Sequence, residues 1–396
     1  MRKKTPPMED LISSLPVEIL HYILSFLPTK LAFTTSVLSK RWNLICNSLP
    51  VLHFDDKAEE DEEAYIRFRR FVDKVLLSPR VHHHPIETLS IVCHSKLCKD
   101  RSRFNTDEWI EAAKRRRIKN LQLSTWTSYL HLRPSVFTSQ TLVVLKLIDI
   151  VMDHGVGSID LPSLTTLHLI HILFRQRDDV KKILNGCPIV EDLTVLPPNF
   201  EVGYTTEGFK TLPKVVKAHI NVFEVPFNAI PNVEFLHIKM ERGEEAKYIN
   251  SCFRKMPVFR NLINLQLTYV RFPGWVGVME VLPYCPKLQS LAIEKLWYGQ
   301  NHQEKWAHTK EAVPECVSLH LTTCFIKTYQ IVIGNYQIED MYAYDFDFAE
   351  YILQNARVLQ VLTFHNPLSD ESEKDRLFKH LSRCSRISPT CRIECN

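Results

Sequence analysis

Leu164–Leu169 reads LTTLHL, and eight further stretches of the chain repeat its L-x-x-L-x-L spacing of apolar residues. Consecutive copies lie between 18 residues apart (Ala218 to Leu236) and 29 residues apart (Leu236 to Leu265). These separations scatter around the roughly 20–29 residues of a leucine-rich repeat. Alternating apolar positions turn one strand face inward, and stacked strands bury that face as one continuous core. The other copies are IKNLQL (Ile118), LVVLKL (Leu142), VEDLTV (Val190), VVKAHI (Val215), VEFLHI (Val233), LINLQL (Leu262), LQSLAI (Leu288) and CVSLHL (Cys316).

The segments between these strands predict short helices that end before proline. DDVKKILNGCP (Asp178–Pro188) and GVMEVLPYCP (Gly277–Pro286) have this form. Cys187 and Cys285, each directly before its proline, are expected to be small buried fillers. Because the asparagine of many such repeats is mostly missing, we expect an irregular solenoid over residues 65–312.

A third region, residues 313–396, predicts a unit that caps the solenoid. FDFAEYILQNARVLQVLTF (Phe346–Phe364) has helical spacing first and then a last strand, LQVLTF. Such a unit would cover the open end of the stacked strands. The fold class predicted from these patterns is α/β.

An acidic run, DDKAEEDEE (Asp55–Glu63), separates the repeats from the N-terminal stretch. Charge runs of this kind are usually solvated. We therefore predict an acidic linker over residues 51–64, or an exposed helix start at the same place.

The stretch SLPVEILHYILSFLPTKLAFTTSVLSKRW (Ser14–Trp42) predicts short helices with more apolar surface than they can bury among themselves. Pro16 suits a first helical turn and Pro28 a helix end. Further helices are expected over residues 31–38 and 40–49. A helix with so wide an apolar stripe is buried on more than one side. The stripe consists of Leu15, Ile19, Ile23 and Phe26, widened by Leu20, Leu24 and Leu27.

This stretch resembles an F-box: L-P near its start, apolar pairs, S-F-L-P and then V-L-S-K-R-W. We place the F-box at residues 8–50. FVDKVLLSP, WIEAAKRRRIKNLQL and the repeats resemble plant F-box proteins with leucine-rich repeats. VPECVSLHLTTCFIK and FAEYILQNARVLQVLTF are similar to the FBD domain of that family, so the likeness spans nearly the whole chain.

The resemblance implies a substrate-recruiting subunit of an SCF ubiquitin ligase without catalytic residues of its own. Its F-box would bind the SKP-type adaptor, and through it cullin and a RING protein. About half of the residues carried over by motif are expected only to hold the helices together. They are Leu15, Pro16, Ile19, Leu20, Ile23, Leu24, Leu27, Pro28, Val37, Leu38 and Trp42.

The central x of each L-x-L should point away from the core, onto the concave face that solenoids commonly use for binding. Four of these nine residues are histidines. We therefore hypothesise a polar substrate groove that titrates partly near neutral pH; the plainer interpretation is that histidine is tolerated on an exposed strand. The residues are Gln122, Lys146, His168, Thr194, His219, His237, Gln266, Ala292 and His320.

Composition and motifs argue against several other functions. The excess of 49 Lys+Arg over 45 Asp+Glu is mild for a nucleic-acid binder. No run of 18 apolar residues predicts a membrane span, and MRKKTPPMED is not followed by a secretory apolar segment. We therefore expect a nuclear or cytoplasmic protein with reduced cysteines.

We found no motif for catalysis, a cofactor or a metal. Glycine-rich phosphate loops, nucleophile elbows and zinc helices are missing. Cys93, His94 and Cys98, like His380, Cys384, Cys391 and Cys395, lack the paired spacing of a zinc site. Lys114–Arg117 predicts an exposed helix end, with an anion contact or nuclear-import patch as the alternative; His82–His84 predicts a solvated turn.

Three alternatives to the ligase subunit stay open at this point. The N-terminal helices could merely cap a repeat scaffold that works independently of ubiquitin ligase. The chain could be an enzyme with an unfamiliar site, or a small-molecule receptor of the same ligase class. The substrate itself is not encoded in any recognisable motif.

Overall fold

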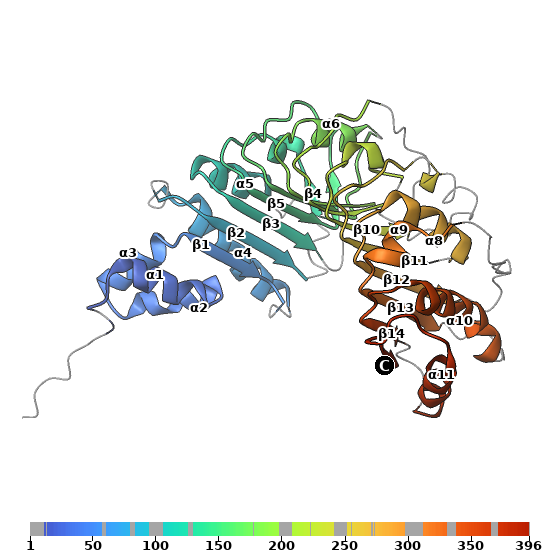
Figure 1. Ribbon diagram of the computed structural model, residues 1–396. Coiled ribbons are helices and arrows are strands. Elements are labelled where there is room, and N and C mark those ends of the chain that lie inside the picture. Colours follow the sequence, from blue (N-terminus) through green and yellow to red (C-terminus); the bar gives the residue numbers. More distant parts are fainter. Residues whose placement is uncertain are drawn as a thin grey trace, which may run out of the picture. The chain divides into compact units, whose positions relative to one another are not determined.

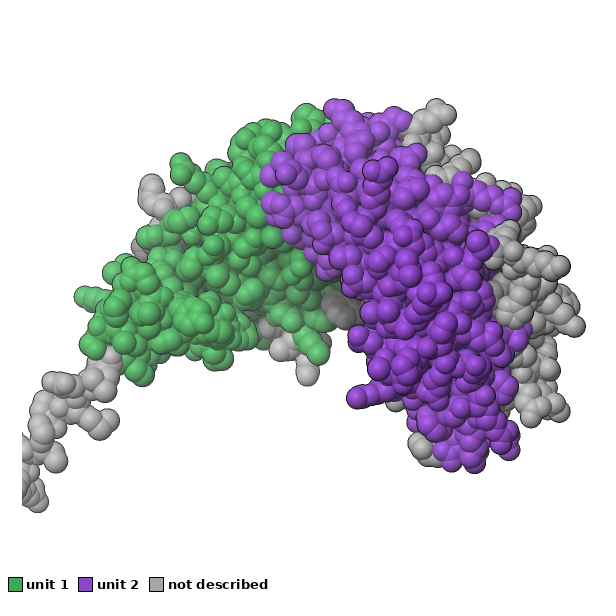
Figure 2. Space-filling model, viewed as in Figure 1, with its two compact units in different colours: residues 1–164, 172–176 green, residues 165–171, 177–396 purple. Residues whose placement is uncertain are grey.

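Parallel strands alternating with helices build both units into which the chain divides (Figure 1). Figure 2 colours unit 1, residues 1–164 and 172–176, and unit 2, residues 165–171 and 177–396. The computed structural model thus confirms the predicted α/β class. It describes residues 12, 14–57, 61–79, 84–94, 106–125, 130–176, 178–197, 208–221, 223–240, 252–254, 256–270, 272, 274–297, 312–330, 338–365 and 371–395.

Unit 1 opens with three short α-helices, followed by a parallel sheet in the order β1-β2-β3-β5 and a small β4-β6 pair. The N-terminal elements are α1 (Val17–Ser25), α2 (Thr29–Thr34), η1 (Thr35–Val37) and α3 (Lys40–Asn47). The sheet elements are β1 (Val51–Asp55), α4 (Glu62–Leu77), β2 (Thr88–Cys93), α5 (Thr106–Arg115), β3 (Asn120–Thr125), β4 (Leu130–Leu132), η5 (Pro134–Phe137), β5 (Val144–Ile148) and β6 (Ile150–Met152).

Unit 2 continues with parallel strands in sequence order from β7 to β15. Its elements are β7 (Thr166–Ile170), α6 (Asp179–Asn185), β8 (Asp192–Leu196), β9 (Lys217–Ile220), η6 (Phe227–Ala229), β10 (Phe235–Met240), β11 (Asn264–Tyr269), α8 (Trp275–Val281), η7 (Leu282–Tyr284), β12 (Ser290–Trp297), α9 (Glu315–Leu319), β13 (Thr323–Gln330), α10 (Ile338–Asn355), β14 (Val361–His365), α11 (Glu371–Arg383) and β15 (Arg392–Cys395).

The two apolar positions of each L-x-L form continuous buried rows across the strands. In unit 1, Leu89, Leu121 and Leu145 are in register. In unit 2, Leu236, Leu265 and Leu291 occupy corresponding positions. Because every strand has the same direction and alternation, each inward side chain packs against the inward side chain of the next repeat. This confirms the mechanism inferred from the spacing.

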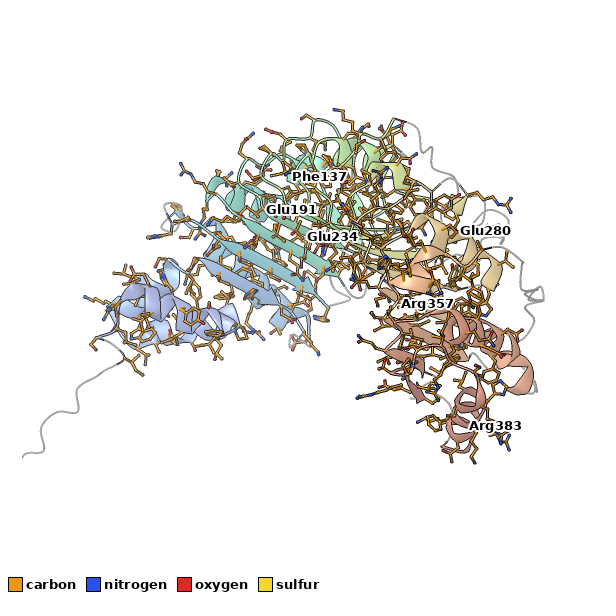
Figure 3. All side chains as sticks on the ribbon, in the orientation of Figure 1. Phe137, Glu191, Glu234, Glu280, Arg357 and Arg383 are labelled. Atoms are coloured by element: carbon orange, nitrogen blue, oxygen red, sulfur yellow. The ribbon has the colours of Figure 1, made fainter. Side chains whose placement is uncertain are left out.

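Most of the strands begin with the same backbone hydrogen bonds: two consecutive amides at the strand start donate to one carbonyl oxygen of the preceding repeat. The amides of Ile263 and Asn264, for example, both donate to the carbonyl oxygen of Glu234, at 2.9 and 3.0 Å. One carbonyl in each repeat therefore fixes the register of the next strand without a special side chain. Figure 3 labels two of these acceptors, Glu191 and Glu234. The full set is Pro50, Glu87 and Lys119 in unit 1, and Thr165, Glu191, Val216, Glu234, Ile263, Gln289 and Thr322 in unit 2.

The region between the N-terminal helices and the first recognised repeat differs from the expected linker. Residues 51–55 form β1, and the acidic run leads into α4, where Asp61 Oδ1 accepts a hydrogen bond from the amide of Ala64 at 2.6 Å. The second alternative, a helix start, is therefore the one observed. Two complete strands, β1 and β2, precede the first predicted repeat. The repeat pattern did not find them, because VLHFD and TLSIVC alternate apolar residues without an L-x-L.

The ninth predicted repeat was wrong. The first four residues of CVSLHL belong to helix α9 and the last two follow it; the strand, β13, begins only after them. Pro314 precedes the helix, and Cys316 and Val317 lie on its buried side, while Leu319 is exposed. The same spacing of apolar residues can be buried in a short helix or in a strand, so a pattern of six residues cannot distinguish the two structures. The predicted C-terminal helix and last strand are confirmed as α10 and β14, after which α11 and β15 extend the same sheet.

A buried ion pair joins α10 to the strands of unit 2, and the sequence patterns did not predict it. Lys295 takes an inward position on β12 and is 1% exposed; its Nζ donates to Asp345 Oδ1 of α10. Trp275 Nε1 donates to the same carboxylate at 3.1 Å, and Thr328 Oγ1 donates to its other oxygen at 3.4 Å. Burial raises the pKa of Asp345, and the interaction with Lys295 opposes that rise. The geometry satisfies both charges, which is what a buried pair requires to persist.

Candidate adaptor-binding surface and concave face

Helix α1 has two apolar faces, and only one of them is buried. Leu20 and Leu24 are 0% and 3% exposed and pack inside the three-helix unit. Tyr22 and Phe26, one turn apart, are 65% and 69% exposed and stack edge to face with ring centroids 4.9 Å apart. Residues at i, i+3 and i+4 share one face of a helix. The exposed aromatic pair therefore lies on the face shared with Ile19 and Ile23, which are also exposed.

The following segments add apolar side chains to the exposed set. Leu31 of α2, Leu38 after η1 and Leu44 of α3 are exposed, and Val37 is 85% exposed. Large apolar groups that stay in contact with water in this number mark an interaction site. We name as the F-box face the residues Val17, Ile19, Tyr22, Ile23, Phe26, Leu31, Val37, Leu38 and Leu44.

The opposite side of the three-helix unit is attached to the sheet of unit 1. Thr29 Oγ1 accepts a hydrogen bond from the amide of His53 on β1 at 2.6 Å. Phe33 of α2 and Phe54 of β1 both pack edge to face against Phe71 of α4, with centroids 5.4 and 6.0 Å away. The helices are thus held from one side, and this attachment leaves the F-box face uncovered by the described residues of unit 1.

The predicted adaptor residues divide into two groups. Leu20, Leu24 and Trp42 are buried, so they hold the helices together; Leu15 and Leu27 are partly buried. Pro16, Ile19, Ile23, Pro28, Val37 and Leu38 are exposed, and their contact with an adaptor stays a prediction. The prediction missed Val17, Tyr22, Phe26, Leu31 and Leu44 as exposed residues, although the i, i+4 spacing of Tyr22 and Phe26 was a usable signal.

On the strands, the central x residues form a second row opposite the buried one. His219, His237 and Gln266 are neighbours in register in unit 2, as are Gln122 and Lys146 in unit 1. His168, Thr194 and Ala292 hold equivalent strand positions. His320 does not, because it ends α9; Phe325 of β13 and Thr363 of β14 hold the positions that follow Ala292.

The histidines of this row interact with one another and with polar side chains next to the row. His168 Nε2 lies 3.3 Å from Asp192 Oδ1, His237 Nε2 lies 2.8 Å from Thr268 Oγ1, and the rings of His219 and His237 stack 3.9 Å apart. Burial, and then the neighbouring His219, lower the pKa of His237 to about 3. His237 therefore stays neutral near neutral pH, contrary to the hypothesis of a titrating groove at this position.

The same face becomes more apolar toward the end of unit 2. Leu296 of β12 and Phe325 and Tyr329 of β13 occupy outward, partly exposed positions. Beside them the carboxyl ends of β10–β13 enclose a hollow of about 280 Å³. It is lined by Lys239, Thr268, Tyr269, Val270, Glu294, Lys295, Leu296 and Tyr329. The outward strand face of unit 2 thus offers polar and apolar contacts on different repeats.

The other predicted chemical groups take structural positions. Arg116 is 3% exposed and its Nε donates to the carbonyl oxygen of His84 at 2.7 Å, while Lys114 Nζ donates to that of Ser135 at 2.9 Å. The expected exposed helix end at Lys114–Arg117 was therefore wrong for these two cations, because the neighbouring segments cover them. Burial lowers the pKa of Arg116 to about 10.

Seven of the ten cysteines in the described residues are buried, as core side chains are. Cys187 and Cys285 are fully buried, as predicted, and burial raises the pKa of Cys187 to about 12. A thiol with a raised pKa is a poor nucleophile and metal ligand. Within the described ranges no three His, Cys, Asp or Glu side chains are grouped to hold a metal ion; Cys98, His82 and His83 lie outside those ranges. No helix in the described part of the chain has the length and apolarity needed to cross a membrane.

Comparison with known families finds three matches along the chain. The F-box domain model matches residues 12–54, and the FBD model matches residues 310–364. The model described as the leucine-rich repeats of FBD-associated F-box protein At5g56370 matches residues 106–250. The chain is an F-box/LRR/FBD protein.

Two relatives in Arabidopsis thaliana are similar to this chain over nearly their full length, and a third is similar over most of it. The F-box/FBD/LRR-repeat protein At4g26340 is 26% identical, with 97% of this chain and 99% of the relative covered. The F-box/FBD/LRR-repeat protein At5g56420 is 25% identical, covering 97% and 98%. The F-box protein At3g59000 is 29% identical over 81% of this chain and 80% of its own length. In this F-box/LRR/FBD protein the F-box match ends inside β1, so its last residues belong to the sheet of unit 1.

Proposed function

We propose that this F-box/LRR/FBD protein is the substrate-recruiting subunit of an SCF ubiquitin ligase. F-box proteins generally act in this way, through a SKP-type adaptor that leads to cullin and a RING protein. The F-box face would bind the adaptor, and the concave face of the repeats would bind a protein substrate. The chain would contribute proximity and no bond chemistry, since holding reactants together is itself a large part of catalysis.

The exposed F-box face is the observation that supports this proposal most. Burying one large apolar side chain contributes about 1.5–3 kcal/mol, so nine such residues represent a strong drive to associate. A monomer gains nothing by exposing them, whereas a permanent partner would cover them. The ten cysteines of the described residues are free thiols, which fits the reducing nucleus or cytoplasm that we propose as its location.

Binding of the purified full-length chain to a purified SKP-type adaptor tests the proposal. The double variant Ile23→Asp/Val37→Asp places two charges on the F-box face. Central apolar contacts each contribute about 2 kcal/mol or more, so the dissociation constant should rise at least about 100-fold.

The matched control is Ile189→Asp/Val258→Asp, which makes the same two substitutions at exposed positions of unit 2. Its affinity should equal that of the wild type. Equal affinity of both double variants, or no binding by the wild type, would contradict the adaptor proposal and favour a repeat scaffold that works independently of ubiquitin ligase.

A further inference from the structure

Strand β15 (Arg392–Cys395) leaves one edge of the unit 2 sheet without a neighbouring strand among the described residues. The amide of Arg392 donates to the carbonyl oxygen of Gln360 at 2.8 Å, so the peptide groups of Arg392 and Glu394 face β14. Peptide groups of successive residues in a strand point to opposite sides. Those of Ile393 and Cys395 therefore lie on the free edge, where unpaired N–H and C=O groups can bind another strand.

The edge strand of unit 1 is covered instead. The amide of His53 on β1 donates to Thr29 Oγ1 of α2 at 2.6 Å, so a helix protects that edge. A proline or a bulge is another common protection of a sheet edge. β15 contains no proline, and its register with β14 is unbroken from Arg392 to Cys395. The free edge of β15 is thus available for pairing.

The side chains of β15 carry a charge pattern that complements a copy of itself. Arg392 and Glu394 are exposed and lie on the outward face, where Thr363 Oγ1 of β14 donates to Glu394 Oε2 at 3.4 Å. Neither forms an ion pair with another described residue. Ile393 lies between them and is half-buried on the inward face. When two copies of β15 run antiparallel about Ile393, each Arg392 lies opposite the Glu394 of the other copy.

We propose that the free edge of β15 is a pairing site for β15 of a second copy of the chain. The pairing is antiparallel and two-fold symmetric, so it closes as a dimer. Both charge contacts form at once, and the Ile393 peptide groups of the two copies exchange two hydrogen bonds. A parallel pairing in register would place like charges side by side, and a uniformly charged strand of another protein would attract only one of the two side chains.

Sedimentation equilibrium of the full-length chain tests the proposal. Because two short strands make a small interface, a weak dimer is expected, with a dissociation constant below about 100 µM. Ile393→Pro removes an N–H from the free edge without removing a hydrogen bond to β14, so the dissociation constant should rise about tenfold or more. Hydrogen exchange at residues 391–395 should slow as the protein concentration rises in the wild type, and not in this variant.

An exchange of charges separates pairing from any structural effect of the substitutions. Arg392→Glu or Glu394→Arg places like charges opposite each other, so each single variant should dimerise about tenfold more weakly. The double variant Arg392→Glu/Glu394→Arg restores both contacts and should dimerise as the wild type does. A double variant as weak as the single ones, or single variants as strong as the wild type, would overturn the proposal.

The F-box face is a second surface on which two copies can associate, and it supplies the matched control. Ile23→Asp/Val37→Asp should leave the dissociation constant of the dimer unchanged, and Ile393→Pro should leave circular dichroism and thermal unfolding unchanged. A wild-type chain that stays monomeric up to about 300 µM would overturn the proposal. A dimer that is lost in Ile23→Asp/Val37→Asp and kept in Ile393→Pro would also overturn it.

Discussion

The N-terminal helices and the repeat strands are both rich in leucine, isoleucine and valine, yet they use these residues in opposite ways. On the strands, alternation puts every second side chain into a row that the next repeat covers, as Leu121 and Leu145 show. On α1, Leu20 and Leu24 turn inward, while Tyr22 and Phe26 remain in water. The inward side chains of each strand pack against those of the neighbouring repeats. The helices carry more apolar faces than the neighbouring elements cover.

This difference separates stability from recognition within one chain. Side chains in the repeat rows should determine the free energy of unfolding, and side chains on the F-box face should determine binding. The two groups can be distinguished by substitution, because only buried groups lose packing when they are truncated.

The largest effect is expected at the buried ion pair of unit 2. Lys295→Met leaves Asp345 buried without its cation, so the free energy of unfolding should fall by about 3–5 kcal/mol. Lys295→Met/Asp345→Asn should recover most of this loss, because Asn removes the charge and still accepts from Trp275. Urea unfolding measures both, and a single variant as stable as the wild type would show that the pair is not closed in solution.

A smaller effect is expected inside the F-box. Leu20→Ala should destabilise the three helices by about 2–5 kcal/mol, since Leu20 is fully buried. Hydrogen exchange of the amides in residues 17–25 should accelerate, while that of β10–β12 should not change. Uniform acceleration along the whole chain would mean that the helices and the repeats unfold together.

The smallest effect on stability is expected on the F-box face. Phe26→Ala should change the free energy of unfolding by no more than about 0.5 kcal/mol. The same substitution at Phe137, buried in η5 and labelled in Figure 3, should lower it by about 3–5 kcal/mol. If Phe26→Ala were as destabilising as Phe137→Ala, the F-box face would be covered by the chain itself, and the comparison would fail.

Eight of the nine predicted repeats could be found from spacing because their alternation meets one simple requirement, burial of one strand face. The wrong prediction at CVSLHL shows the limit of that signal, because there Cys316 and Val317 are buried as part of a helix and not of a strand. The F-box residues were recognised as a group by their order in the sequence. Which of them are buried depends on where α2 and α3 pack, so Leu20 and Trp42 could not be separated from Ile19 and Val37.

The sequence by itself determined the order of the parts, the direction of the inward strand faces and the excess of apolar side chains near the N-terminus, because these follow from local periodicity and composition. Only the tertiary structure decided that Lys295 meets Asp345, that burial lowers the pKa of His237 and that Tyr22 and Phe26 remain uncovered. Each of these depends on segments far apart in the sequence, whose contacts set the hydration of a side chain and therefore its charge and its tendency to bind.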